Sequence, residues 1–233
     1  LFRAVIEAVE GQAPVIAGTG TYDTAHSLHL TEDAARAGAD ALLLVTPYYN
    51  KPPQRGLVEH FTTIAGATGL PVIVYNIPGR TGLRIEHDTL LRLAEVETIV
   101  AVKDSTGDFD GIAKLIREAP DGFEVYCGDD WATFGYVALG AAGVISVASH
   151  VVGERMGQMI EQLETGDLAS ARKIHYDLLP AFDALFITSN PIPLKKAMEL
   201  IGQPVGRPRL PLVEANQDET TRIEAALKES GVL

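Results

Sequence analysis

The chain has 233 residues, of which 46% are hydrophobic and 6% aromatic, enough for one large α/β domain or such a domain with a helical appendage. Its formal net charge of −12 argues against a nucleic-acid-binding protein, because neutralising phosphates needs a basic surface. One cysteine, Cys127, cannot form an internal disulfide, and no apolar run reaches the roughly 18 residues of a membrane span. We therefore predict a cytoplasmic protein without nucleic-acid or membrane partners.

The first eleven residues have the pattern of an amphipathic helix that ends at Gly11. This helix has neither a starting methionine nor a residue that could cap its amino end. We therefore expect the native protein to begin upstream of Leu1.

Strand and helix patterns alternate through the next part of the chain. The apolar runs are too continuous for half-exposed antiparallel strands, so they predict parallel strands buried on both faces, with helices between them. In chain order the predicted elements are strand 14–20, helix 24–38, strand 39–47, helix 56–69, strand 71–76, helix 86–95, strand 98–104, helix 108–119, strand 123–128, helix 131–141 and strand 143–149.

Residues suited to chemistry follow several different strands, as in a (β/α)8 barrel, where the active site lies at the carboxyl ends of the strands. A doubly wound sheet would gather them at one switch point, and neither of its usual phosphate-binding glycine motifs is present. These residues are Tyr48, Tyr49, Tyr75, Arg80, Lys103 and Asp129. The sequence therefore predicts a TIM barrel.

Six strands are visible where a barrel needs eight, so we expect the first two βα units, roughly 60 residues, to be missing from this chain. Beyond residue 149 only helical patterns remain, over 154–164, 168–188, 191–201 and 214–228. The first of these helices would complete the barrel. We therefore predict an N-terminally incomplete barrel over 1–165 and a C-terminal helical extension over 166–233.

Lys103 is the strongest catalytic candidate because it stands near the end of the apolar run 98–104. Burial lowers the pKa of an ammonium group and so makes the amine available to attack a carbonyl carbon. The alternative interpretation is a structural lysine that pairs with Asp104 or extends its ammonium group into water.

Two residues of the preceding strand and its loop could assist Lys103. Tyr75 ends the adjacent strand, where its hydroxyl could shuttle protons during imine chemistry. Arg80 lies between glycines and could bind a carboxylate through two hydrogen bonds. Each residue taken alone is more often a barrel-mouth aromatic or an exposed turn arginine.

The remaining candidates are weaker. Tyr48 and Tyr49 are adjacent, so one can face the barrel mouth while the other meets a partner subunit. The segment 128–130 ends a strand and could simply cap the following helix. His26 and His29 share a helix face but have no third ligand nearby, so we expect no metal site.

Together these motifs resemble the dihydrodipicolinate synthase branch of the N-acetylneuraminate lyase superfamily. The resemblance covers the whole chain in order. The matching stretches are GTG (18–20), VTPYYNKP (45–52), VYNIPGRTG (74–82), VKDSTGD (102–108), GDD (128–130), GVISV (143–147), SNPIPLK (189–195) and RLPL (209–212).

The resemblance implies that Lys103 forms a Schiff base with pyruvate, which then condenses with aspartate-4-semialdehyde in lysine and diaminopimelate biosynthesis. It implies that Tyr75 is the proton shuttle and that Arg80 binds the semialdehyde carboxylate. Gly128 and the backbone near Ile145 would form the pyruvate pocket. No metal or dissociable cofactor is implied.

The resemblance also implies a homodimer or homotetramer. Tyr48 and Tyr49 would lie near the dimer interface, and Tyr49 would complete a Tyr-Thr-Tyr proton relay in a neighbouring subunit. The family's Gly-Thr-Thr-Gly-Glu loop, which supplies the threonine, is not in this sequence. Tyr22 and His26 stand where lysine-inhibited members have Asn and Glu, so we expect weak or no lysine feedback.

Two alternatives remain open. One is a sister 2-keto acid lyase, of the N-acetylneuraminate or 2-keto-3-deoxygluconate type, although sugar-acid lyases usually have another residue in place of Arg80. The other is a non-catalytic relative that keeps the barrel as a binding or scaffold protein.

Overall fold

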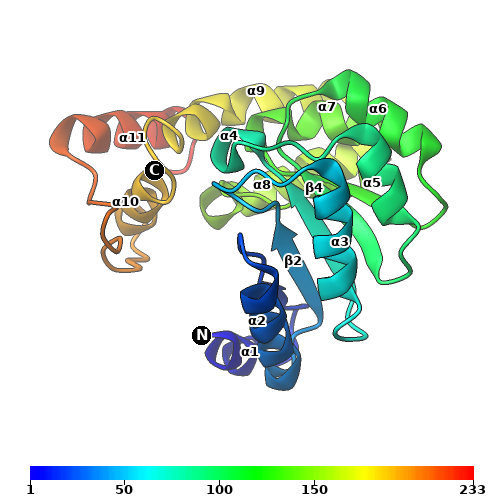
Figure 1. The fold of residues 1–233 in the computed structure, drawn as a ribbon. Coiled ribbons are helices and arrows are strands. Elements are labelled where there is room, and N and C mark those ends of the chain that lie inside the picture. The colour runs from blue at the N-terminus through cyan, green and yellow to red at the C-terminus, as the bar shows by residue number, and fades with distance from the viewer. The chain divides into compact units, whose positions relative to one another are not determined.

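The computed structural model describes residues 1–233, which form two compact units (Figure 1). The first comprises Leu1–Gly128 with Leu139–Ala142, and the second comprises Asp129–Ala138 with Gly143–Leu233. None of the helices combines the length and the apolar character that a membrane span requires.

A parallel sheet forms the centre of the first unit. Its strands are β1 (Ile16–Gly18), β2 (Ala41–Val45), β3 (Val72–Asn76), β4 (Ile99–Asp104) and β5 (Glu124–Cys127), paired in chain order. Consecutive residues Val72, Ile73 and Val74 are all buried. Because successive strand side chains point to opposite faces, the sheet is covered on both faces, as the apolar runs predict.

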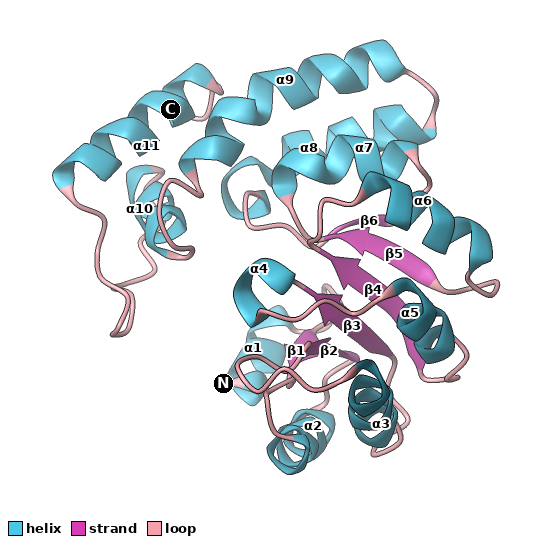
Figure 2. Cartoon of the chain, turned by 45° about the horizontal axis from the view of Figure 1, so that its top comes forward, coloured by secondary structure: helices cyan, strands magenta, loops and turns pink.

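Helices follow the strands of the first unit and pack beside one another in chain order (Figure 2). Leu57, Phe61 and Ile64 are spaced at helical intervals and are fully buried, so they give one of these helices its apolar face. The helices are α1 (Phe2–Val9), α2 (Thr24–Ala37), α3 (Gln54–Ala65), the short α4 (Pro78–Thr81), α5 (His87–Ala94) and α6 (Phe109–Glu118).

Helices dominate the second unit. It contains the 3₁₀ helix η1 (Asp130–Ala132), α7 (Thr133–Ala138), the short strand β6 (Gly143–Val144), α8 (Ser149–Glu164), α9 (Leu168–Ala184), α10 (Ile192–Leu200) and α11 (Gln217–Glu229). Residues of α8, α9, α10 and α11 share one apolar core, which includes Val152, Met156, Leu178, Phe182, Ala197, Ile223 and Leu227.

Polar contacts join three of these helices at the end of α11. Arg155 on α8 donates to the carbonyl of Ser230 at 2.6 Å and lies 3.1 Å from the carboxylate of Asp177 on α9. The Ser230 hydroxyl accepts from the backbone N–H of Ala181 on α9 at 3.1 Å. These contacts fix the end of the chain against the apolar core.

The predicted alternation of strands and helices is confirmed, with all six strands present and shorter than expected. The strand predicted over 143–149 was wrong beyond Val144, because α8 already begins at Ser149. The helix predicted over 131–141 is divided into η1 and α7. Closure into an eight-stranded barrel and an extension beginning at residue 166 stay predictions.

Candidate active site

Lys103 and Tyr75 lie side by side at the carboxyl end of the sheet. The register of β3 and β4 pairs the two residues directly, as predicted. Paired residues of neighbouring strands project to the same face. The Nζ atom of Lys103 lies 4.2 Å from the centre of the Tyr75 ring, and Lys103 is only 9% exposed. A buried amine therefore stands against a phenol.

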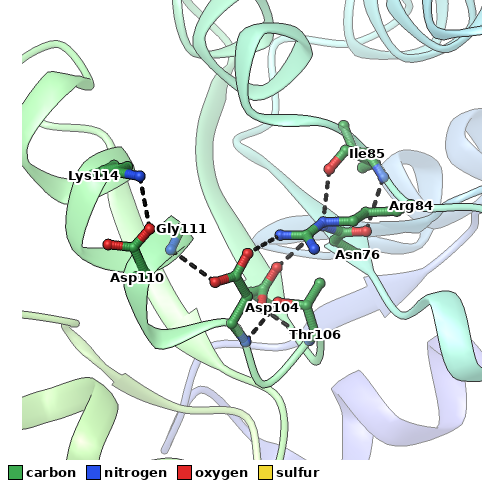
Figure 3. Close-up of polar contacts among 9 residues, drawn as sticks. Asn76, Arg84, Ile85, Asp104, Thr106, Asp110, Gly111 and Lys114 are labelled. Atoms are coloured by element: carbon green, nitrogen blue, oxygen red, sulfur yellow. Dashed lines mark hydrogen bonds and ion pairs between the residues drawn. The ribbon is translucent and has the colours of Figure 1, made fainter.

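Asp104 occupies the other side of β4. Its carboxylate accepts hydrogen bonds from the Asn76 amide at 3.1 Å and from the backbone N–H and hydroxyl of Thr106 at 2.9 and 2.6 Å (Figure 3). Because adjacent strand residues project to opposite faces, Asp104 points away from Lys103. This geometry disfavours the interpretation of Lys103 as a structural partner of Asp104.

The same network connects the segments that follow β3 and β4. The side chain of Asn76 both donates to the carbonyl of Ile85, at 3.2 Å, and accepts from its N–H, at 3.0 Å. Arg84 forms an ion pair with Asp108, the residue that caps α6. The Arg84 hydrogen bond is the main cause of the lowered pKa of Asp108. These contacts fix the loop that leaves Lys103.

Gly128 lies immediately beside Lys103. Its N–H donates to the Asp104 carbonyl at 2.7 Å. A Cβ atom at this position would collide with the hydroxyl of Ser105 and lie 3.1 Å from Cε of Lys103. Glycine is therefore needed here because the Ser105 hydroxyl, beside the lysine, occupies the place that a Cβ would take.

Arg80 lies in the short helix α4 rather than in the predicted loop. The turn forms because the Thr81 hydroxyl donates to the carbonyls of Ile77 and Leu83, at 3.1 and 2.9 Å. Gly82 ends the helix in the left-handed conformation, with φ of 73°. Arg80 is exposed, so its guanidinium is accessible to a charged molecule.

The loop after β2 presents the two tyrosines differently. Tyr48 is 39% exposed and packs its ring edge against Tyr22, with 5.4 Å between ring centres, whereas Tyr49 is 90% exposed. Tyr49 also has a φ of 74°, which is uncommon for a residue with a side chain. The loop holds a bulky aromatic ring outward at a conformational cost.

Two other candidates belong to the second unit. Ile145 follows β6, and its role stays a prediction. Asp129 precedes η1, but its side chain makes no capping hydrogen bond. The buried carboxylate of Asp130 instead accepts from the Ser146 hydroxyl and, at 2.9 Å, from the N–H of Ala148.

His26, His29 and Tyr22 have surface positions. His29 lies 3.5 Å from Asp33, one helical turn away on α2, and its side chain is 66% exposed. Tyr22 is 55% exposed. No group of three or more His, Cys, Asp or Glu side chains in the chain has the arrangement of a metal site. Weak or absent lysine feedback stays a prediction.

Sequence reasoning did not find the residues that support Lys103. Thr46 is fully buried, and both its hydroxyl and its N–H donate to the Tyr75 carbonyl, at 2.7 and 2.9 Å. Asn76 and Asp104 hold the loops, and Ser105 lies over Gly128. One sequence feature could have indicated them, namely a polar residue directly at the end of an apolar strand. A buried polar group at such a position destabilises the fold unless it has a hydrogen-bond partner.

Comparison with known proteins decides the family. A family model described as the dihydrodipicolinate synthetase family matches residues 1–230. The chain belongs to the dihydrodipicolinate synthetase family. A 4-hydroxy-tetrahydrodipicolinate synthase from Moorella thermoacetica is 51% identical over 233 residues, which are 100% of this chain and 80% of that relative.

Solved structures of this family agree with the fold. Dihydrodipicolinate synthase from Cyanidioschyzon merolae with lysine bound has a TM-score of 0.97 and 41% identity, covering 100% of this chain and 79% of that one. The chloride-inhibited enzyme from Acinetobacter baumannii, complexed with pyruvate, has a TM-score of 0.96 and 39% identity, with coverage of 100% and 80%. The α/β architecture with parallel strands is thus that of the family.

Proposed function

We propose that the protein condenses pyruvate with aspartate-4-semialdehyde to give 4-hydroxy-tetrahydrodipicolinate, through a Schiff base on Lys103. The observation that carries this proposal is the buried Nζ of Lys103 at 4.2 Å from the centre of the Tyr75 ring. Membership of the dihydrodipicolinate synthetase family supports the choice of substrates. The reaction belongs to lysine and diaminopimelate biosynthesis.

In this mechanism the neutral amine of Lys103 attacks the keto carbon of pyruvate. The new C–N bond forms as the carbonyl π electrons move to oxygen, and that oxygen then leaves as water to give the imine. Loss of a proton from the pyruvate methyl group gives an enamine, whose carbon attacks the aldehyde carbon and regenerates the imine. The amino group of the semialdehyde then adds to the imine carbon, which closes the ring as the bond to Lys103 Nζ breaks and the free amine is restored. Tyr75 shuttles protons between these steps, because its hydroxyl belongs to the residue that faces the amine.

Other residues bind the substrates. The exposed guanidinium of Arg80 holds the semialdehyde carboxylate. Gly128, which lies beside Lys103, and Ile145 keep the substrate-binding roles that the resemblance implies. A sugar-acid lyase is less consistent with an arginine at position 80. The chemistry needs no metal or dissociable cofactor.

We further propose a cytoplasmic homodimer or homotetramer in which Tyr49 reaches the active site of a neighbouring subunit and Tyr48 lies near the dimer interface. The 90% exposure of Tyr49 and its left-handed backbone support this role, because an aromatic ring held in water gains stability from a partner. We also propose that residues 1–165 belong to a (β/α)8 barrel and that residues 166–233 form a helical extension.

Borohydride reduction in the presence of pyruvate tests the mechanism. We expect a pyruvyl adduct on Lys103, located by peptide mass mapping, and no adduct in Lys103→Arg, because a guanidinium is not a nucleophile at neutral pH. Lys195 is the matched control, since its ammonium donates to the backbone carbonyls of Val205, Gly206 and Arg207 within the second unit. The Lys195→Arg variant should still form the adduct on Lys103. Absence of an adduct on the folded parent protein would overturn the proposal.

A further inference from the structure

We propose that Ser105 is a further substrate-contacting residue. Its hydroxyl binds the keto oxygen of the 2-keto acid while Lys103 attacks the keto carbon. The inference rests on the proposed function. It assigns to one side chain the stabilisation of the oxygen that is later lost as water.

The first observation is that the hydroxyl of Ser105 is unusual among the buried polar atoms. Its Oγ is inaccessible to solvent and has no hydrogen-bond partner in the protein. The backbone of Ser105 is nevertheless fixed, since its N–H donates to the Asn76 carbonyl at 2.9 Å. A buried hydroxyl left without a partner destabilises the fold, so its retention calls for a reason other than stability.

Neighbouring hydroxyls show that the fold satisfies such groups where they are structural. Thr46 donates to the Tyr75 carbonyl, and Thr106 donates to the Asp104 carboxylate. Thr81 bonds the carbonyls of its own turn. Compared with these hydroxyls around the strand ends, that of Ser105, beside Lys103, differs because it has no hydrogen-bond partner in the protein.

The second observation is the position of Ser105. The Ser105 Oγ occupies the place that a Cβ of Gly128 would take, 2.0 Å from that point, and Lys103 Cε lies 3.1 Å from the same point. Cε carries the nitrogen that bonds the keto carbon, and the keto oxygen is one bond further. The Ser105 hydroxyl is therefore close to the end of the Lys103 side chain, and a keto acid bonded to Nζ brings its keto oxygen near that hydroxyl.

The chemistry fits a hydroxyl. The keto oxygen gains negative charge as the C–N bond forms, and then becomes the hydroxyl of a carbinolamine. A serine can donate to the first form and rotate to accept from or donate to the second. A donor aimed at developing charge in a site shielded from water lowers the barrier to the addition.

The test compares Ser105→Ala with the parent protein by rapid-quench borohydride trapping of pyruvate. We expect the rate constant of adduct formation to fall about tenfold, the effect of losing one hydrogen bond. We also expect the melting temperature to stay equal or rise, because the variant removes an unpaired buried hydroxyl. A structural role would instead lower the melting temperature.

Ser27→Ala is the matched control, because the Ser27 hydroxyl is buried in the same unit and bonds both the N–H and the hydroxyl of Thr21, each at 2.9 Å. The Ser27→Ala control should have a lower melting temperature than the parent protein and should trap pyruvate at the parent rate. An unchanged trapping rate in Ser105→Ala would overturn the inference, as would a lowered melting temperature. If the parent also fails to trap pyruvate, the proposed function itself is wrong.

Discussion

The strand ends of the first unit and the helical core of the second unit bury very different groups. At the strand ends the buried side chains are polar, and most have partners at defined distances. They include Thr46, Asn76, Lys103 and Asp104, none more than 9% exposed. The core of the second unit is built from aliphatic and aromatic side chains such as Met156, Leu178 and Phe182.

This difference separates two physical tasks. Hydrogen bonds are directional, so the network around Asn76 and Asp104 fixes where the loop after β4 runs and where Lys103 stands. Apolar burial has no direction and scales with area, so the second core contributes stability without specifying the position of any reacting atom. Substitutions in the two regions should therefore affect different measurements.

The largest effect is expected at the strand ends. Tyr75→Phe removes only the hydroxyl, so the ring against Lys103 is kept while proton transfer is lost. We expect kcat to fall about 10²- to 10⁴-fold, with a change of less than about 1 kcal/mol in unfolding free energy. Steady-state kinetics and thermal unfolding measure the two. A Tyr176→Phe control, at an exposed tyrosine of α9, should change neither quantity.

Leu178→Ala tests the opposite region. Leu178 is fully buried in the core of α8, α9, α10 and α11. We expect the free energy of unfolding to fall by about 2–5 kcal/mol, while kcat per folded molecule stays at the parent value. Denaturant unfolding and active-site titration with borohydride check the two parts. A loss of kcat at full folding would show that the second unit also positions the reacting groups.

A smaller effect is expected from His60, which is buried but lies on α3, outside the strand-end network. Its Nδ1 is 2.8 Å from the Thr24 hydroxyl, and burial lowers its pKa to about 4, against the opposing influence of Asp23. The unfolded chain therefore binds a proton more readily than the folded one. Stability should be complete above pH 6.5 and fall towards pH 4, by at most about 1.4 kcal/mol per pH unit.

Unfolding at a series of pH values measures this slope. His60→Asn keeps a hydrogen-bonding group without the titration, so part of the slope should disappear in that variant. His29→Asn, at an exposed histidine, should retain the full slope. If His60→Asn and the parent lose stability in parallel between pH 6.5 and 4, other groups carry the acid sensitivity.

Much of the fold could be predicted from the sequence because local patterns determine it. The buried strands follow from continuous Val, Ile and Leu runs. The N-terminal ends of α2 and α6 are set by Asp23 and Asp108, which precede these helices and whose side chains accept capping hydrogen bonds from backbone N–H groups. The end of α1 at Glu10 and Gly11 follows from their left-handed backbone. These features depend on neighbours within a few residues.

The sequence by itself thus determined the order of strands and helices, and strand pairing in chain order then placed Lys103 beside Tyr75. Only the tertiary structure decided which polar residues support them. Asn76 bonds Ile85 and Asp104 because neighbouring strands bring separate loops to one edge. Ser105 was invisible for the same reason, since its unpaired hydroxyl is defined by what surrounds it in space. Local propensity acts along the chain, whereas partners for buried polar groups come from segments distant in sequence.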